Sequence, residues 1–255
     1  MQPIWPHFRA YPLQPGIIFI DLASSPLSNE IDRLCNQQLQ HFLAWLSDGK
    51  VPADSACGQL QAILVEVVGG YHQAHFYYDF IATHARSLVA SAVVERLQQA
   101  WQEFQGRPEL AERSGTNSGQ LHEVPVCYSE TLGPDLVTIA ATLDTTVADV
   151  IELHTAPEYY IYTIGFAPNF AYMGDVAAEL QQPRLASPRT KVPALSVAIA
   201  ERQTAIYPLA SPGGWHLLGR AVGLPNWRAG DRVKFVAISE QDYQQRTQDR
   251  QQHAD

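Results

Sequence analysis

Cysteine and charge are both scarce in this sequence of 255 residues, and the scarcity limits what the protein can be. Its three cysteines, Cys35, Cys57 and Cys127, are odd in number, far apart and outside any C-x-x-C pair, so they indicate neither a disulfide framework nor a zinc site. Charged residues make up 17% of the chain against 46% hydrophobic residues, which excludes a disordered or coiled-coil protein. We therefore expect a globular protein with ordinary buried thiols and no metal site.

Basic residues and long apolar runs are also few. Lys and Arg number 17 against 26 Asp and Glu, so the formal net charge is −9, and such a chain repels the phosphate backbone of nucleic acids. No stretch approaches the roughly 18 apolar residues that a membrane span needs, and the first residues lack a basic segment followed by an apolar one. We expect a cytoplasmic protein that binds neither nucleic acid nor membrane.

Residues 1–106 combine alternating and helical hydrophobic patterns, which predict a small α+β N-terminal domain. One strand is expected on each side of a turn at Pro15 and Gly16. A helix with Ser25 as its N-cap is expected to run to Gly49. Further elements expected here are strands at 62–68 and 75–80 and a helix from about Arg86 to Phe104.

The rest of the chain predicts a second domain of a different class. A polar stretch at 107–120, rich in Gly, Ser and Asn, is typical of a linker. Residues 121–240 include a capping box at Thr146 and Asp149, followed by short apolar runs between Pro and Gly, and this pattern is typical of a closed, mostly-β barrel with long loops. The polar tail, 241–255, is expected to be frayed or a solvated helix.

Charge is distributed unevenly along the second domain. Between Leu180 and Gly230 six basic residues stand against one acidic residue, Glu201, which gives the stretch a net charge of +5. Arginines bind carboxylate or phosphate through two parallel hydrogen bonds, so several of them at a barrel mouth would form an anion site. Scattered arginines that pair with acidic surface groups are an equally good interpretation. The basic residues are Arg184, Arg189, Lys191, Arg202, Arg220 and Arg228.

Other candidate site residues are less specific. The turn from Ser211 to Gly214 has unobstructed backbone N–H groups that could hold an anion, although a plain hairpin turn explains it equally well. His154, near the end of an expected helix, is better explained as a protonated C-terminal cap, and His216 is a weak candidate for proton transfer. The sequence contains no G-x-S-x-G elbow, P-loop, Rossmann glycine pattern or H-E-x-x-H motif. The residues alone predict an anion-binding β-barrel domain.

Three motifs follow one another in the barrel region: G-F-x-P-x-F-x-Y at 165–172, P-R-x-x-x-P-R-x-x-V-P at 183–193 and S-P-G-G-W-x-x-x-G-R at 211–220. With these motifs the chain resembles, over about 122–239, the KipI / allophanate hydrolase subunit 1 family, whose bacterial members are mostly 5-oxoprolinase B subunits. The resemblance implies an α+β N-terminal domain followed by a cyclophilin-like barrel.

The resemblance also implies partners and a reaction. The partners would be a C subunit of the KipA / allophanate hydrolase subunit 2 type and an A subunit of the LamB/YcsF type. Together such subunits open 5-oxoproline to glutamate, with ATP as the co-substrate of the complex, and this chain would be inactive alone. Two alternatives remain open, a KipI-like inhibitor of a sensor histidine kinase and a carboxyltransferase subunit that acts with a biotin-bearing partner.

The resemblance and the charge argument together assign roles to residues of the motifs. Arg184, Arg189 and Arg220 would hold the substrate anion, and the turn with Ser211, Gly213 and Gly214 would donate N–H groups. This hypothesis predicts that Arg189→Ala or Arg220→Ala abolishes anion binding with little loss of folding. The implied pocket wall consists of Phe166, Pro168, Phe170, Tyr172, Thr204, Tyr207 and Trp215.

Several positions depart from the family pattern. Asn169, Leu195, Glu201 and Ala205 stand where the family has glycine, and Ala221 with Val222 replaces Thr-Pro after the last motif. Glycine is favoured where the backbone has a positive φ or where a ligand approaches the backbone closely. A larger side chain at such a position alters the loop or fills the space. We therefore expect a remodelled pocket, with weaker anion binding if Glu201 faces it.

Overall fold

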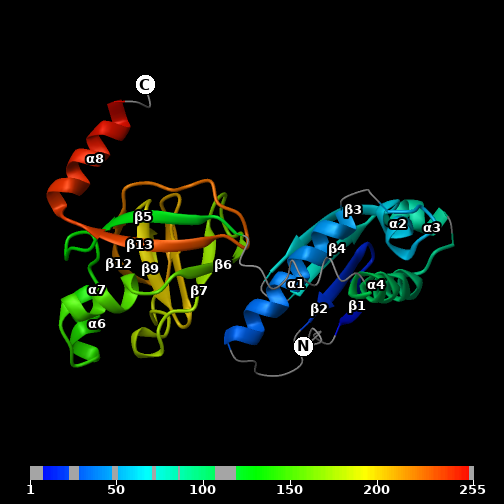
Figure 1. Cartoon of the computed structure of the whole chain (residues 1–255), viewed down its shortest axis with the longest axis horizontal. Coiled ribbons are helices and arrows are strands. Elements are labelled where there is room, and N and C mark those ends of the chain that lie inside the picture. Colours follow the sequence, from blue (N-terminus) through cyan, green and yellow to red (C-terminus); the bar gives the residue numbers. More distant parts are fainter. Residues whose placement is uncertain are drawn as a thin grey trace. The chain divides into compact units, whose positions relative to one another are not determined.

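The computed structural model describes residues 8–22, 29–47, 51–70, 73–85, 87–106 and 119–252, and the chain divides into two compact units, Met1–Ser118 and Gly119–Asp255 (Figure 1). The expected N-cap Ser25 and almost all of the expected linker at 107–120 lie outside the described residues. Within the described ranges, no helix combines the length and the apolar character needed to cross a bilayer.

The first unit contains a four-stranded antiparallel sheet in the order β1-β2-β4-β3. The tight turn between the first two strands is possible because Gly16 adopts a φ of +83°, which is costly for other residues. The sheet consists of β1 (Arg9–Gln14), β2 (Ile17–Asp21), β3 (Leu64–Gly69) and β4 (Gln73–Tyr78).

Helices cover one face of this sheet. The long helices α1 (Asn29–Ser47) and α4 (Ala90–Gln105) supply Phe42, Trp101 and Phe104 to a core that they share with alternate residues of β2 and β4. The helix expected from about Arg86 begins at Ala90, because a separate short helix, α3 (Phe80–Ala85), precedes it. Another short helix, α2 (Ala56–Gln61), begins at the side-chain cap of Ser55.

The second unit is a closed barrel of seven strands in the order β10-β7-β6-β13-β5-β12-β9 (Figure 1), which confirms the predicted barrel. Its first and last strands, β5 and β13, pair in parallel, whereas the other neighbours in the barrel pair antiparallel. The strands are β5 (Leu121–Cys127), β6 (Tyr159–Ile164), β7 (Ala171–Gly174), β9 (Ser196–Ala200), β10 (Gln203–Ile206), β12 (His216–Ala221) and β13 (Arg232–Ile238).

Two layers of apolar side chains pack on the barrel wall. Because side chains alternate along β9, Val197 and Ile199 point into the barrel core, whereas Ala198 and Ala200 belong to a second cluster on the outer face. That outer cluster also contains Val192 from a small two-stranded sheet, β8 (Arg189–Val192) with β11 (Ser211–Gly213). The outer cluster carries the candidate site.

The remaining helices lie against or beyond the barrel. α6 (Leu136–Thr142) and α7 (Val147–Thr155) follow β5, and α7 begins with the predicted capping box of Thr146 and Asp149. A 3-10 turn, η1 (Ala178–Leu180), follows β7. The polar tail forms α8 (Glu240–Gln252), a mostly exposed helix that extends from the end of β13 (Figure 1).

Candidate functional site

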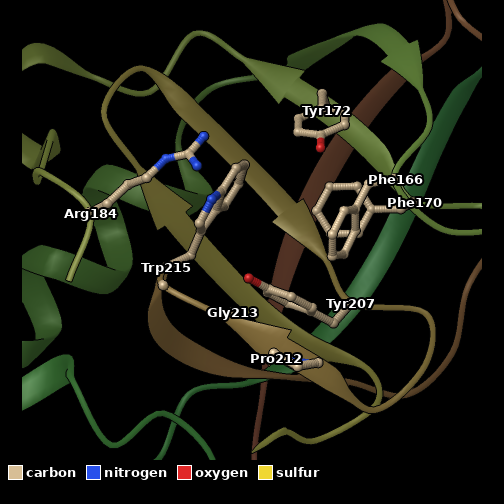
Figure 2. A pocket seen from close by; sticks show the side chains of 9 residues that line it. Phe166, Phe170, Tyr172, Arg184, Tyr207, Pro212, Gly213 and Trp215 are labelled. Atoms are coloured by element: carbon tan, nitrogen blue, oxygen red, sulfur yellow. The ribbon is translucent and has the colours of Figure 1, made fainter. Parts of the chain in front are cut away.

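An open pocket of about 130 Å³ lies over the outer cluster of the barrel (Figure 2). It is built mainly from the three segments that carry the sequence motifs, which are the loop leading into β7, the loop before β8, and β11 with the turn that follows it. Tyr207, directly after β10, adds to the wall. The lining residues are Phe166, Phe170, Tyr172, Arg184, Tyr207, Pro212, Gly213, Gly214 and Trp215. Eight of these nine were predicted as site residues from the sequence, and the ninth, Pro212, belongs to the predicted turn.

Aromatic rings form most of the pocket wall. Phe170 is only 2% exposed, and its ring centroid lies 4.8 Å from that of Tyr172, 5.4 Å from that of Tyr207 and 6.0 Å from that of Trp215. Phe166 packs edge-on against Phe170 but stays 66% exposed at the mouth. The wall is therefore preformed, and a flat apolar ring could pack against it without rearranging the core.

Arg184 is the cation of this pocket. Its guanidinium carbon lies 6.0 Å from the centroid of the Trp215 ring, a cation–π arrangement that holds the long side chain over the pocket (Figure 2). Among the residues that the structure describes, Arg184 has no hydrogen bond and no ion pair. Its guanidinium donors are therefore available to an anionic ligand.

Two tyrosine hydroxyls complete the polar part of the pocket. Burial raises the pKa of both Tyr172 and Tyr207, and the positive charge of Arg184 only partly offsets this effect, so both hydroxyls remain protonated donors near neutral pH. Gly213 is required beside them, because a Cβ atom at this position would overlap the Tyr207 hydroxyl. Gly214 has no such restriction, since its Cβ would lie at ordinary contact distance from Pro188, at 3.6 Å, and from the Leu185 carbonyl oxygen, at 3.8 Å.

Arg189, which the sequence-based hypothesis assigns to the anion site, does not line the pocket. Its Nη2 donates to Asp135 Oδ1 at 2.7 Å, and the other oxygen of Asp135 accepts the Leu217 N–H at 2.6 Å. Both side chains of the pair are largely covered, with 29% and 12% exposed. The pair joins β8 to β12 and to the start of α6, which is a structural role. Asp135 was missed from the sequence because its partner is 54 residues away.

The other predicted site residues also lie apart from the pocket lining. Pro168 is exposed, Ser211 pairs with Val192 in the small sheet, and Arg220 lies farther along β12. His216 Nε2 lies 2.9 Å from the Pro183 carbonyl, to which it donates, so this imidazole holds the motif loop rather than facing the pocket.

Thr204, predicted as pocket wall, is fully buried in a polar network with His154. The Thr204 hydroxyl donates to the Ala198 carbonyl at 3.1 Å, so it accepts from His154 Nε2 at 2.9 Å. His154 Nδ1 must then accept from the Tyr128 hydroxyl at 2.8 Å. Burial lowers the pKa of His154 to about 3, so the expected protonated cap is wrong and the imidazole is neutral.

The substituted glycine positions keep the backbone that glycine favours. Asn169, Leu195 and Glu201 have φ angles of +62°, +64° and +52°, all in the left-handed region. None of them lines the pocket, and neither does the fourth position, Ala205, which is buried in the outer cluster. The loops therefore keep this backbone at a cost in strain, and none of the four side chains fills the pocket.

Metal-binding groupings do not occur in the part of the chain that the structure describes: no three His, Cys, Asp or Glu side chains gather there. All three cysteines are buried thiols. The chemistry of the pocket is that of a binding site, with aromatic walls, one arginine and two hydroxyl donors.

Comparisons with known proteins identify the family of the chain. Residues 25–232 match the family model described as carboxyltransferase domain, subdomain C and D. The 5-oxoprolinase B subunit of Haemophilus influenzae is 37% identical over 187 residues, covering 70% of this chain and 81% of that protein. The namesake from Escherichia coli O157:H7 is 39% identical over 170 residues, covering 63% and 73%. The one from Bacillus subtilis is 44% identical over 144 residues, covering 53% of this chain and 60% of that protein.

Solved structures extend the likeness to the fold. The crystal structure of TTHA0988 superposes with a TM-score of 0.63 at 28% identity, covering 88% of this chain but only 40% of the longer protein. The crystal structure of Kluyveromyces lactis urea carboxylase superposes with a TM-score of 0.62 at 14% identity, and the match covers 96% of this chain and 23% of the carboxylase. The two proteins therefore share the fold. The chain belongs to the carboxyltransferase subdomain C and D family and, within it, is a relative of the bacterial 5-oxoprolinase B subunits.

Proposed function

We propose that this chain is the B subunit of a multi-subunit, ATP-dependent 5-oxoprolinase and that its pocket binds 5-oxoproline. The overall reaction would convert 5-oxoproline, ATP and water to glutamate, ADP and phosphate. The observation that carries the proposal is the aromatic pocket beside the free guanidinium of Arg184. 5-Oxoproline is a small flat lactam with one carboxylate, and its ring, its carboxylate and its carbonyl oxygen each have a counterpart in this pocket.

The lactam ring would pack against the aromatic wall that Phe170 and Trp215 help to form, and its carboxylate would pair with Arg184. Figure 2 shows the Tyr172 hydroxyl pointing into the same space, where it can donate to the lactam carbonyl oxygen. Such a donor draws electron density from the carbonyl carbon and favours attack there. No nucleophile or phosphate-binding loop lies among the lining residues, so the ATP-dependent step is assigned to the assembled complex.

Partner subunits are part of the proposal. The pocket is open on one side, where Phe166 and Arg184 are exposed, and a partner that covers this side would exclude water from the reacting group. The relatives are named as B subunits, which supports an assembly. We expect the partners to be a KipA-type C subunit and a LamB/YcsF-type A subunit, with ATP as the co-substrate of the complex.

The test is 5-oxoproline-dependent ATP hydrolysis by this chain mixed with candidate A and C subunits, with each subunit omitted in turn. Arg184→Gln is expected to raise KM for 5-oxoproline at least about tenfold, because a charge-assisted hydrogen bond is lost. The matched control is Arg228→Gln, which removes an exposed arginine outside the pocket and should leave KM unchanged. Tyr172→Phe should mainly lower kcat. Folded, assembled subunits that hydrolyse no ATP would refute the proposal and favour the kinase inhibitor.

A further inference from the structure

Arg220 is a partly buried arginine that has no partner among the described residues. It lies on β12, its Nε atom is buried without a hydrogen-bond acceptor, and within the described ranges its guanidinium forms no hydrogen bond or ion pair. The other barrel arginines with buried Nε atoms, Arg202 and Arg232, are paired with Asp175 and Glu158. A buried donor without an acceptor costs free energy, so an arginine left in this state calls for an explanation.

The neighbours of Arg220 are unsatisfied as well. Arg220 pairs across the sheet with Ser196 of β9 and with Cys127 of β5, and paired residues point to the same face. Ser196 is 0% exposed, and its hydroxyl has no hydrogen-bond partner among the described residues. The hydroxyl of Ser129 is also buried, beside the Cys127 thiol, which is only a weak partner.

These groups share one chemical requirement. A guanidinium offers only donors, and a serine hydroxyl can turn its hydrogen toward an acceptor. Arg220 Nε and the Ser196 hydroxyl lack an acceptor, and the Ser129 hydroxyl has only a weak one. Such donors, one of them cationic, fit a ligand with several acceptor oxygens and negative charge. We propose that Arg220, Ser196 and Ser129 form an oxyanion-binding site, for a carboxylate or a phosphate group, on the outer face of the barrel.

The site is distinct from the aromatic pocket. None of its three residues lines the pocket, and the sheet places Ser196 next to the backbone of Tyr207, whose ring forms the pocket wall. Because Arg220 is only partly covered, an anion from solvent reaches the guanidinium, and the oxyanion, alone or with an ordered water, supplies the acceptors that Nε and the hydroxyls lack.

Charges around Arg220 set the direction of a second test. Burial raises the pKa of the Cys127 thiol, and the carboxylate of Glu240, at the start of α8, raises it further. The negative charge of Glu240 therefore reaches Cys127, which pairs with Arg220 across the sheet. It forms no ion pair with Arg220 in the described structure. A negative charge nearby weakens anion binding, so Glu240→Gln should tighten it.

The experiment follows the arginine Nε–H signals of the full chain by ¹H–¹⁵N NMR during titration with sodium phosphate or sodium acetate, at ionic strength held constant with sodium chloride. Arg220→Lys identifies the Arg220 signal by its loss. We expect a saturable shift of this signal. Saturation by phosphate alone would identify a phosphate site, whereas saturation by both anions would identify a site that also accepts carboxylates. By calorimetry, Ser196→Ala should weaken binding several-fold, Arg220→Met at least about tenfold, and the control Arg228→Gln not at all.

Two results would overturn the proposal. The first is an Arg220 signal that responds to neither anion, or that responds as much to chloride alone. The second is unchanged affinity in Arg220→Lys and Ser196→Ala, which keep the positive charge and the packing respectively, and therefore remain informative even if Arg220→Met fails to fold.

Discussion

Acid should destabilise the barrel through one buried histidine, His154. The imidazole is neutral in the folded protein because burial lowers its pKa to about 3 from the ordinary value of 6.5. In the unfolded chain the same group takes up a proton below about pH 6.5, so the unfolded state binds more protons in the interval between the two values. Stability contributed by neutral His154 is therefore complete above pH 6.5 and is lost progressively as the pH falls toward 3.

The magnitude follows from the two pKa values. The shift from 6.5 to about 3 corresponds to a loss of roughly 5 kcal/mol in total, and about 2.5 kcal/mol of it falls between pH 7.5 and pH 4.5. Asp149 and Asp231 also have lowered pKa values and add a loss of the same sign at more acidic pH. Burial would raise the pKa of Asp231, but hydrogen bonds from His122 and two backbone N–H groups outweigh it.

The assay compares guanidinium unfolding of the wild-type chain and His154→Gln at pH 7.5, 6.0 and 4.5. Gln can keep a donor and an acceptor between Thr204 and Tyr128 but does not titrate. The variant should be less stable at pH 7.5, and the difference should shrink by about 2.5 kcal/mol at pH 4.5, because the carboxylates contribute equally to both proteins. A difference that stays constant over this range would show that His154 is not buried as a neutral group.

Three further predictions rest on packing and backbone geometry. Gly213→Ala should displace the Tyr207 phenol, cost about 1–3 kcal/mol in thermal unfolding and weaken ligand binding in the pocket, whereas Gly214→Ala should be nearly neutral; equal effects would contradict the contact with Tyr207. Glu201→Gly should stabilise the chain by about 0.5–1 kcal/mol, by relief of a left-handed backbone at an exposed side chain, and Glu201→Ala should not; a gain from alanine would assign the effect to charge. Arg189→Met should destabilise the barrel by about 1–3 kcal/mol, because Asp135 is left without its cation. Calorimetry should show unchanged ligand binding in the pocket. Lost binding with intact stability would instead support the hypothesis that Arg189 holds the substrate anion.

Sequence reasoning succeeded where the signal was local. The turn at Gly16 and the capping box at Thr146 depend on residues a few positions apart, and both are present. The helix predicted from about Arg86 was less accurate, because the helical pattern does not show where one helix stops and the next begins. Boundaries of this kind depend on tertiary packing.

The arginines show why the site was harder to predict. Arg184 and Arg189 are five residues apart in one motif with the same composition around them, and nothing in the sequence separates their roles. The roles differ because Asp135 lies within hydrogen-bond distance of Arg189 and no carboxylate is paired with Arg184 among the described residues. Charge counting finds cations, but only the fold decides which of them are already neutralised.

The parallel pairing of β5 with β13 has a consequence for how this unit is made. The last strand of the barrel lies between β5 and β6, and Leu121 pairs with Arg232, so the ring stays open until residues more than a hundred positions apart come together. During synthesis on the ribosome, β5 and β6 each have one unpaired edge until β13 has emerged. A chain truncated before Arg232 should therefore aggregate, whereas one truncated after Ser239 has every barrel strand and should assemble the barrel without α8.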